Sequence, residues 1–366
     1  MSNADNSLAN ELRASAERFV ADKSDHARNR ALRKSLPGHD AALWDEIVAM
    51  GWLGIVVPEA DGGIGLGLPE MAAIVGSLEK GLLSGPLIEL AVLGPRALVH
   101  APTGDMRSTL LSGVGDGSVR IALAMGSNGA LPVVTGDEGT HISGQCAEVA
   151  GGAAATHFLI PAKIGDVLRL VAVSADAPGL SLAPHWRADG TPLAALSLDG
   201  VVIDDAMLIA RGADAHAAIA RALDETRIVA AAGLTGLSEH MLAMTIDYIK
   251  VRQQFDAVIG SFQAIQHKSV DLYIQKELAI ATLGQALGAD AGDAAALSLA
   301  AIRAKGRASA AAMRIGREAI QLHGAIGFTE EHDLGLFVKR AMVLSAWLGN
   351  ATVQRRRYIE KGQVFA

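Results

Sequence analysis

Two changes of pattern, near residues 118 and 212, divide this sequence into three segments and limit the folds it can adopt. Up to about residue 118, apolar residues recur at helical spacing, most clearly over 8–23, 40–50 and 69–80. From residue 119, short runs typical of strands are separated by Gly, Asp and Pro, at 120–125, 131–135, 158–161, 168–173 and 195–203. We therefore expect an all-helical domain over 1–118 and an antiparallel barrel or sandwich over 119–212.

Long helical patterns return over 213–366. One apolar stripe has spacings of three and four, which predicts a helix with one buried face; it consists of Leu234, Leu237, Met241, Met244 and Tyr248. A second helix is expected from Gln263 into the 280s, and a third, rich in alanine, over 293–322. The glycine-rich loop 61–67 follows no strand and contains no lysine, so we expect a turn between helices rather than a phosphate-binding loop.

Composition narrows the functional classes. Half of the 366 residues are hydrophobic and 19% are charged, as in a compact globular protein. The net charge of −7 disfavours a nucleic-acid partner, and one cysteine, Cys146, cannot form a disulfide framework. Residues 1–10 do not resemble a signal peptide, and no apolar run approaches the ~20 residues of a membrane span. We expect a cytoplasmic protein without membrane or nucleic-acid partners.

Three segments carry a family resemblance. Residues 252–267 read RQQFDAVIGSFQAIQH and residues 321–329 read QLHGAIGFT, while residues 51–59 read GWLGIVVPE shortly before Gly62 and Gly63. The first resembles the acyl-CoA dehydrogenase signature R-x-x-F-G-x-x-I-x-x-F-Q-x-x-Q-H, and the second resembles that family's Q-x-x-G-G-x-G-[FY]-[ST]. The third resembles the family's N-terminal segment, so the resemblance spans nearly the whole chain.

The resemblance implies a multidomain α+β fold with an N-terminal helical domain, a central β-domain and a C-terminal four-helix bundle that pairs with another chain. It also implies FAD shared across a subunit interface, an acyl-CoA substrate, and an electron-transferring flavoprotein as electron acceptor. The cofactor residues that it implies are Arg252, Gln254, Phe255, Gln263, Gln321, Leu322, Gly324 and Gly327. Arginine can bind pyrophosphate bidentately, glutamine can both donate and accept, and glycine lets a backbone amide approach a ligand closely.

Each of these residues alone has a simpler explanation. Arg252 alone suits a surface ion pair, Gln263 a helix cap, and the two glycines an interhelical turn. Their spacing together favours the cofactor. His267 and His323 are expected to be structural, and no metal site is predicted.

The sequence departs from the family where the chemistry needs a base. Most members place a glutamate before the last helix, in the segment that aligns with Trp347 to Asn350, and Leu348 stands in its place. A minority place it directly before an arginine on the first helix of the C-terminal domain, where this chain has Thr226. Glu225 lies one residue earlier, about 100° away around a helix, and is the fallback candidate together with Asp333.

The flavin-ring segments of the β-domain depart from the family as well. The family's T-E-P-x-x-G-S-D loop is matched at best by residues 125–128, MGSN. Its W-I-T segment appears as Glu148, Val149 and Ala150, without a tryptophan or a hydrogen-bonding threonine. The residues that would hold a neighbour's adenosine are kept, whereas those that would hold this chain's own flavin ring are not.

This pattern resembles the non-catalytic subunit of heteromeric α2β2 acyl-CoA dehydrogenases, which include enzymes of fatty-acid and steroid side-chain β-oxidation. On this hypothesis no catalytic residue is expected in the chain, and the partner is a second acyl-CoA dehydrogenase subunit. One alternative is a self-sufficient homotetrameric dehydrogenase that uses Glu225 as an unconventional base. Another is a non-catalytic scaffold, which the retained Arg252 disfavours.

Overall fold

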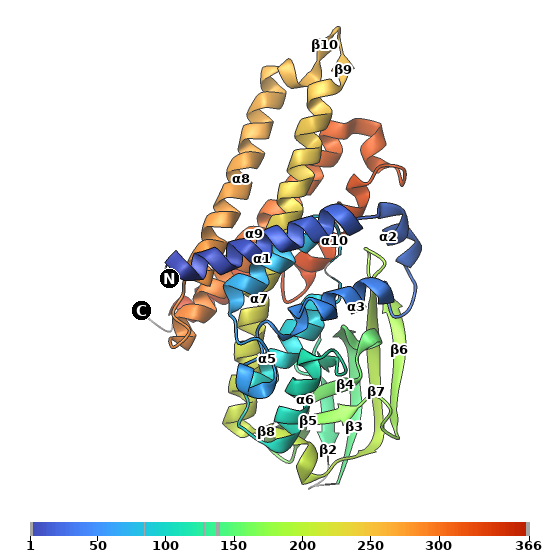
Figure 1. The fold of residues 1–366 in the computed structure, drawn as a ribbon, viewed down its shortest axis with the longest axis vertical. Coiled ribbons are helices and arrows are strands. Elements are labelled where there is room, and N and C mark those ends of the chain that lie inside the picture. The colour runs from blue at the N-terminus through green and yellow to red at the C-terminus, as the bar shows by residue number, and fades with distance from the viewer. Residues whose placement is uncertain (1–2, 84, 127–128, 137–139, 364–366) are drawn as a thin grey trace. The chain divides into compact units, whose positions relative to one another are not determined.

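The computed structural model describes residues 3–83, 85–126, 129–136 and 140–363 (Figure 1). Its N-terminal region is helical, as predicted: α1 (Asn3–Lys23), α2 (His26–Leu32), α3 (Ala41–Ala49), α4 (Leu68–Glu79), α5 (Gly94–Val99) and α6 (Asp105–Gly115). Asp40 caps α3, because its carboxylate accepts hydrogen bonds from the N–H groups of Ala42 and Leu43. The helices α2, α5 and α6 were not predicted; α2 has seven residues and α5 has six, which is too few to show a clear period.

The β-rich segment folds into one eight-stranded sheet. Its strands are β1 (Ile121–Leu123), β2 (Val133–Gly136), β3 (His141–Ala150), β4 (His157–Ile164), β5 (Val167–Ser174), β6 (Leu180–Trp186), β7 (Pro192–Val202) and β8 (Leu208–Arg211). The order is β6-β7-β3-β2-β4-β5-β8, with β1 paired to β4. Apolar residues of β4 and β5 are buried over most of their length, and these residues form the core of the sheet.

The sheet differs from the antiparallel arrangement predicted, because β1 and β2 both pair parallel to β4. Ile121 lies opposite His157 at one end of β4, and Gly136 lies opposite Ile164 at the other. The two strands therefore follow each other along the same edge of β4 and share a direction. Two consecutive runs of this kind look like an antiparallel pair in the sequence, since only their common pairing with β4 distinguishes the two arrangements.

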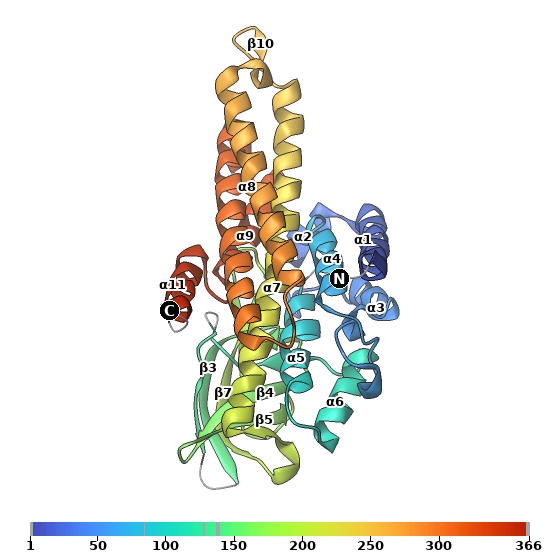
Figure 2. The ribbon, with the colours of Figure 1, turned by 90° about the vertical axis from the view of Figure 1, so that its left-hand side faces the viewer.

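The C-terminal region contains α7 (Gly212–Val251), α8 (Gln263–Leu287), α9 (Ala294–His323), α10 (Leu334–Ala346) and α11 (Ala351–Gln363). The helices α8, α10 and α11 all pack on α9, and Figure 2 shows α8 and α9 side by side. Small side chains make this close packing possible, since ten of the sixteen buried residues of α9 are Ala, Ser or Gly. Close approach also occurs between α4 and α7, where a Cβ at Gly236 would lie 2.0 Å from the Gly76 carbonyl oxygen.

The chain forms two compact units. The first consists of Met1–His26, Ala72–Leu83 and Arg227–Ala366, and the second of Ala27–Met71 and Ser84–Thr226. The helix α7 contributes to both. The division at residues 118 and 212 into three domains stays a prediction.

The glycine-rich loop 61–67 is a turn between helices, as predicted. Gly62 has φ of 85°, and the N–H groups of Gly63 and Gly65 donate to the carbonyls of Pro58 and Val57. Within the residues that the structure describes, no helix is both long and apolar enough to cross a membrane.

Candidate functional site

A β-hairpin joins α7 to α8 and carries the first predicted cofactor motif (Figure 1); its strands are β9 (Gln253–Gln254) and β10 (Ala257–Val258). Phe255 and Asp256 form its tip with φ of 56° and 58°, the left-handed pair of a type I′ turn. Phe255 is 90% exposed. Arg252 is exposed, and its guanidinium makes no ion pair or hydrogen bond with any described residue. The hairpin therefore presents an available cation and an aromatic ring at the surface.

The second motif begins where α9 ends. Gln321 is exposed and Leu322 is buried. Gly324 has φ of 68° and would meet no atom within 4 Å if it carried a Cβ, so its backbone is open to a ligand. Gly327 is buried, and a Cβ there would lie 2.9 Å from the Ile320 carbonyl oxygen. Gly327 thus lets the 3-10 turn η7 (Gly324–Phe328) fold back against α9.

Tyr248 and His323 bring these two motifs together. Their rings stack with centroids 4.4 Å apart, and the Tyr248 hydroxyl donates to the His323 carbonyl at 3.2 Å. Tyr248 lies one turn before Arg252, whose N–H donates to the Tyr248 carbonyl at 3.0 Å. Because His323 directly precedes Gly324, this contact fixes the end of α7 against the end of α9. Two residues 75 positions apart in the sequence therefore join the two motifs on one surface.

His323 has the structural role expected of it. The ring is buried, and its Nδ1 lies 2.8 Å from the Ala319 carbonyl oxygen. Burial lowers the pKa of His323, an effect that the neighbouring His332 reinforces. A neutral imidazole is what a stacked, buried ring requires.

Two other predicted cofactor residues, Gln263 and Gln254, lie beside and within the hairpin. Gln263 is the first residue of α8 and is exposed close behind the hairpin. The side-chain amide of Gln254 donates to the carbonyl of Gln253 at 2.9 Å, within the hairpin itself.

This surface suits a dinucleotide more than a proton-transfer centre. An exposed guanidinium can hold phosphate oxygens, an exposed amide can both donate and accept, and an open glycine backbone admits a close ligand. Arg252, Gln321 and Gly324 supply these three groups. They could hold the pyrophosphate and adenosine part of FAD.

The turn between α10 and α11 contains Leu348, the residue predicted from the sequence to stand where the family has its base. Leu348 is 1% exposed and has φ of 61°, a conformation that costs a non-glycine residue about 1–2 kcal/mol. Its carbonyl accepts hydrogen bonds from Gln354 Nε2 at 2.8 Å and from Arg357 Nη1 at 2.7 Å. Asn350 caps α11 through the N–H groups of Thr352 and Val353. These hydrogen bonds hold the turn in one strained conformation. The side chain that Leu348 contributes there is a hydrocarbon.

Lys305 supports the same turn from α9. It is fully buried, and its Nζ donates to Ser309 Oγ at 3.1 Å, to the Ser345 carbonyl at 2.9 Å and to the Gly349 carbonyl at 3.4 Å. Burial lowers the pKa of Lys305 to about 7, with the Arg227 and Arg357 cations acting in the same direction. The sequence analysis did not identify this lysine, because an isolated lysine in an alanine-rich helix is normally exposed.

The two other base candidates on α7 are both engaged. The hydroxyl of Thr226 donates to the Ala222 carbonyl at 2.6 Å.

Glu225 is 1% exposed, and its oxygens lie 2.5 Å from Arg96 Nε, 3.0 Å from His100 Nε2 and 2.9 Å from Arg221 Nε. Burial alone would raise the pKa of Glu225, but hydrogen bonds from His100 and Arg96 and the Arg96 charge lower it to about 2. Such a carboxylate is a weak base. The third candidate, Asp333, is the N-cap residue of α10.

Two segments predicted to lack the family's flavin-ring contacts belong to the β-rich region. Glu148 is exposed near the end of β3, and the side chains of Val149 and Ala150 are buried. Met125 is buried after β1. Residues 127 and 128 of the other segment lie outside the described residues.

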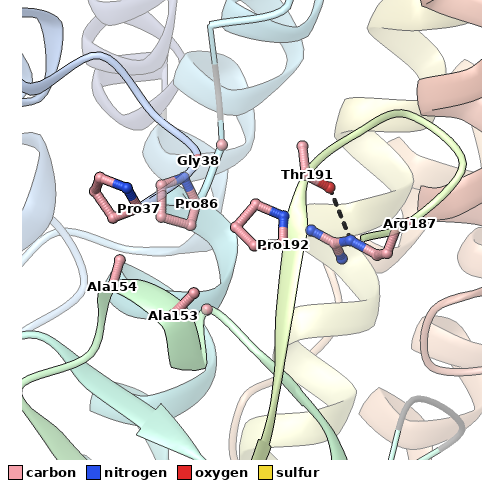
Figure 3. Close-up of a pocket in the computed structure, with 10 residues that line it drawn as sticks. Pro37, Gly38, Pro86, Ala153, Ala154, Arg187, Thr191 and Pro192 are labelled. Carbon is pink, nitrogen blue, oxygen red and sulfur yellow. Dashed lines mark hydrogen bonds between the residues drawn. The ribbon is translucent and has the colours of Figure 1, made fainter. Parts of the chain in front are cut away.

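A small pocket opens near the end of β3 (Figure 3). Its lining is mostly Gly, Ala and Pro, with Arg187 and Thr191 as the polar exceptions. Thr191 Oγ1 accepts a hydrogen bond from Arg187 Nε at 2.8 Å. About 10 Å³ is open to a water-sized sphere, which is room for about one water molecule. This pocket is too small for a cofactor or an acyl group.

Comparison with known families decides the assignment. The model of the acyl-CoA dehydrogenase N-terminal domain matches residues 7–118, and that of the C-terminal domain matches residues 216–362. Together these ranges cover more than half of the chain. The chain belongs to the acyl-CoA dehydrogenase family. The predicted resemblance and the predicted fold are thereby confirmed.

Three relatives illustrate the position of this acyl-CoA dehydrogenase. Acyl-CoA dehydrogenase IpdE2 of Mycobacterium tuberculosis (strain ATCC 25618 / H37Rv) is 30% identical, over 90% of this chain and 89% of that protein. The structure of a variant of the Tcur3481-Tcur3483 steroid ACAD is 31% identical, with a TM-score of 0.88 over 98% of each chain. The ChsE4-ChsE5 complex from Mycobacterium tuberculosis is 26% identical, with a TM-score of 0.88 over 99% of this chain and 98% of that chain.

Proposed function

We propose that this acyl-CoA dehydrogenase chain is the subunit of a heteromeric enzyme that lacks the catalytic base and completes the FAD site of a partner subunit. Family membership supports FAD as cofactor and an oxidoreductase activity on a CH–CH bond. The observation that carries the proposal is Leu348, where the resemblance predicts the family's base: its side chain is a buried hydrocarbon, and its carbonyl accepts hydrogen bonds from Gln354 and Arg357.

The remaining candidate base does not replace it. The α-proton of an acyl-CoA must pass to a group with a pKa near the working pH, whereas the pKa of Glu225 is lowered to about 2. Its carboxylate is also held by Arg96 and Arg221. These contacts favour the hypothesis of a heteromeric enzyme over that of a homotetramer that uses Glu225.

The other half of the proposal rests on the available groups at the ends of α7 and α9. When bound, FAD accepts the hydride that leaves the β-carbon of the acyl group. In this chain Arg252 would hold the pyrophosphate, Gln321 and Gly324 would face the adenosine, and Phe255 and Gln263 would border it. This set would serve a flavin whose ring lies in the partner subunit, so each FAD would be shared across an interface.

An apolar face on α8 supports association through the C-terminal helices. Val270, Tyr273, Ile274 and Leu278 recur at helical spacing and are 57%, 53%, 45% and 46% exposed. Exposed apolar side chains in one row are typical of a protein interface. We propose that this face packs on a second subunit, and the heteromer named in the ChsE4-ChsE5 structure is consistent with it.

The proposed reaction of the complex is α,β-dehydrogenation of an acyl-CoA, with electrons passing to an electron-transferring flavoprotein. The steroid ACAD among its structural relatives makes a steroid side chain one candidate acyl group beside a fatty acyl group. The direct test is dehydrogenation of an acyl-CoA series by the chain purified alone, with FAD and a dye acceptor added. We expect no turnover. Turnover that is lost in Glu225→Gln would overturn the proposal in favour of the homotetrameric enzyme.

A further inference from the structure

A cationic cluster in the second compact unit is not used by the proposed function. It forms where α5 packs against the N-terminal part of α7, and its cations all contact the carboxylate of Glu225. Arg96 and His100 come from α5 and its C-cap, and Arg221 lies one turn before Glu225 on α7. The Glu225 side chain is 2% exposed, whereas those of Arg96, His100 and Arg221 are 17%, 23% and 16% exposed. The carboxylate is therefore covered, and the cations border the surface.

The two arginines of the cluster differ in how many of their hydrogen-bond donors have an acceptor. Each of the three nitrogens of the Arg96 guanidinium is engaged, because Nε and Nη2 donate to Glu225 and Nη1 donates to the Val56 carbonyl at 2.8 Å. Arg221 uses only Nε, at 2.9 Å from Glu225 Oε1. Its Nη1 and Nη2 donate to no residue in the described part of the chain. A guanidinium with both terminal nitrogens available can bind two oxygens of one ligand.

The charges of the cluster do not balance. Two guanidinium groups face one carboxylate, which leaves a net charge of +1 with His100 neutral and +2 with His100 protonated. An ion pair connected to the same end of α5 is balanced, since Arg107 Nη1 lies 2.9 Å from Asp61 Oδ1. Arg107 also donates to the carbonyls of Leu98 and Val99, which connects that pair to the same end of α5. An excess of positive charge beside unused donors is the composition of an anion site.

We propose that Arg221, with Arg96 and His100 beside it, binds a phosphate group at this surface. A tetrahedral oxyanion offers two oxygens to the terminal nitrogens of Arg221, and a dianion neutralises the excess charge that Glu225 leaves. The phosphate can be free or part of a larger molecule such as a nucleotide. The site is separate from the residues proposed to hold FAD and does not depend on that proposal.

The test compares thermal unfolding in inorganic phosphate and in sodium chloride of equal ionic strength. The variants are Arg221→Gln and, as a matched control, Arg18→Gln, which removes an exposed arginine of α1. Phosphate should raise the Tm of the wild type and of Arg18→Gln by about 2–4 °C at saturating concentration. Arg221→Gln should lose this rise. No rise in the wild type, or an equal rise in Arg221→Gln, overturns the proposal.

Arg221→Lys covers the case in which Arg221→Gln does not fold. Lysine keeps the charge beside Glu225 but has no planar fork, so phosphate affinity measured by calorimetry should fall about tenfold or more. Unchanged affinity contradicts the assignment. Titration with adenosine 3′,5′-bisphosphate then separates the two sources of phosphate. Binding tighter than that of inorganic phosphate indicates a nucleotide ligand, and equal binding indicates free phosphate.

Discussion

At the scale of single residues, the proposed function assigns to Leu348 the absence of a catalytic base in this chain. Leu348→Glu would place a carboxylate at the position that we propose for the family's base, on a turn whose carbonyls accept hydrogen bonds from Lys305, Gln354 and Arg357. Because we propose that this chain's own flavin-ring segments are also lost, the base alone should not create activity. We expect no acyl-CoA dehydrogenation by purified Leu348→Glu, measured with a dye acceptor and with Leu348→Gln as the uncharged control. Activity in the glutamate variant alone would mean that only the base was missing.

Glu225 gives a second prediction at this scale. Its pKa is lowered to about 2 in the folded chain, below the ordinary value near 4.3. Its contribution is therefore complete above about pH 5 and is lost as the pH falls toward 2. A difference of about 2 pKa units corresponds to about 3 kcal/mol. Glu225→Gln should remove this acid-dependent part of the unfolding free energy.

The measurement is urea unfolding of Glu225→Gln and wild type at several pH values between 7 and 3. The matched control is Glu11→Gln, because Glu11 is an exposed glutamate of α1. Glu11→Gln should keep the wild-type dependence on pH. If Glu225→Gln kept it as well, the carboxylate would not be held by the cations as described.

At the scale of elements, the contact between the ends of α7 and α9 is the device that assembles the proposed cofactor surface. Tyr248→Ala removes both the ring stacking on His323 and the hydrogen bond to its carbonyl. The free energy of unfolding should fall by about 2–3 kcal/mol. Tyr248→Phe keeps the ring and should cost about 1 kcal/mol. Chemical denaturation measures both, with Tyr358→Ala on α11, where the tyrosine is 40% exposed, as the control.

A loss in Tyr248→Ala no larger than that in Tyr358→Ala would contradict this role. A loss in Tyr248→Phe equal to that in Tyr248→Ala would assign the effect to the hydroxyl rather than to the stacked ring.

The helices and strands also show how much of the fold could be predicted from the sequence. Long helices such as α8 and α9 were predicted closely, because apolar spacing repeats over many turns in them. The short helices α2, α5 and α6 and the strand β6 were not predicted. In β6 most residues are exposed, so it has no buried face to produce an alternating pattern. The shared direction of β1 and β2 depends on their pairing with β4, which is a tertiary contact.

The candidate site was predictable where it depends on a linear motif. The motifs named Arg252, Gln321 and Gly324, and the structure brings their segments together through Tyr248 and His323. Tyr248 was recognised only as part of an apolar stripe, since its contact partner lies far away in the sequence. The cationic cluster around Glu225 could not be predicted, because it joins α5 to α7 across more than 120 residues.

At the scale of the whole molecule, association through α8 is the first consequence to test. Ile274→Asp places a charge in the middle of the exposed apolar face and should shift the chain, alone or with its partner, to a smaller assembly. Sedimentation velocity measures the change. Val167→Asp on β5 is the matched control, because Val167 is 44% exposed outside that face and Ile274 is 45% exposed. An unchanged sedimentation coefficient in Ile274→Asp would place the interface elsewhere.

The central claim is that this chain holds half of a shared FAD site and has lost the half for its own flavin ring. The most direct test is the visible absorption spectrum of the chain purified alone, with its protein concentration measured on the same sample. We predict no flavin band, and the appearance of one after co-purification with the partner subunit. A full equivalent of bound FAD in the chain alone would contradict the account.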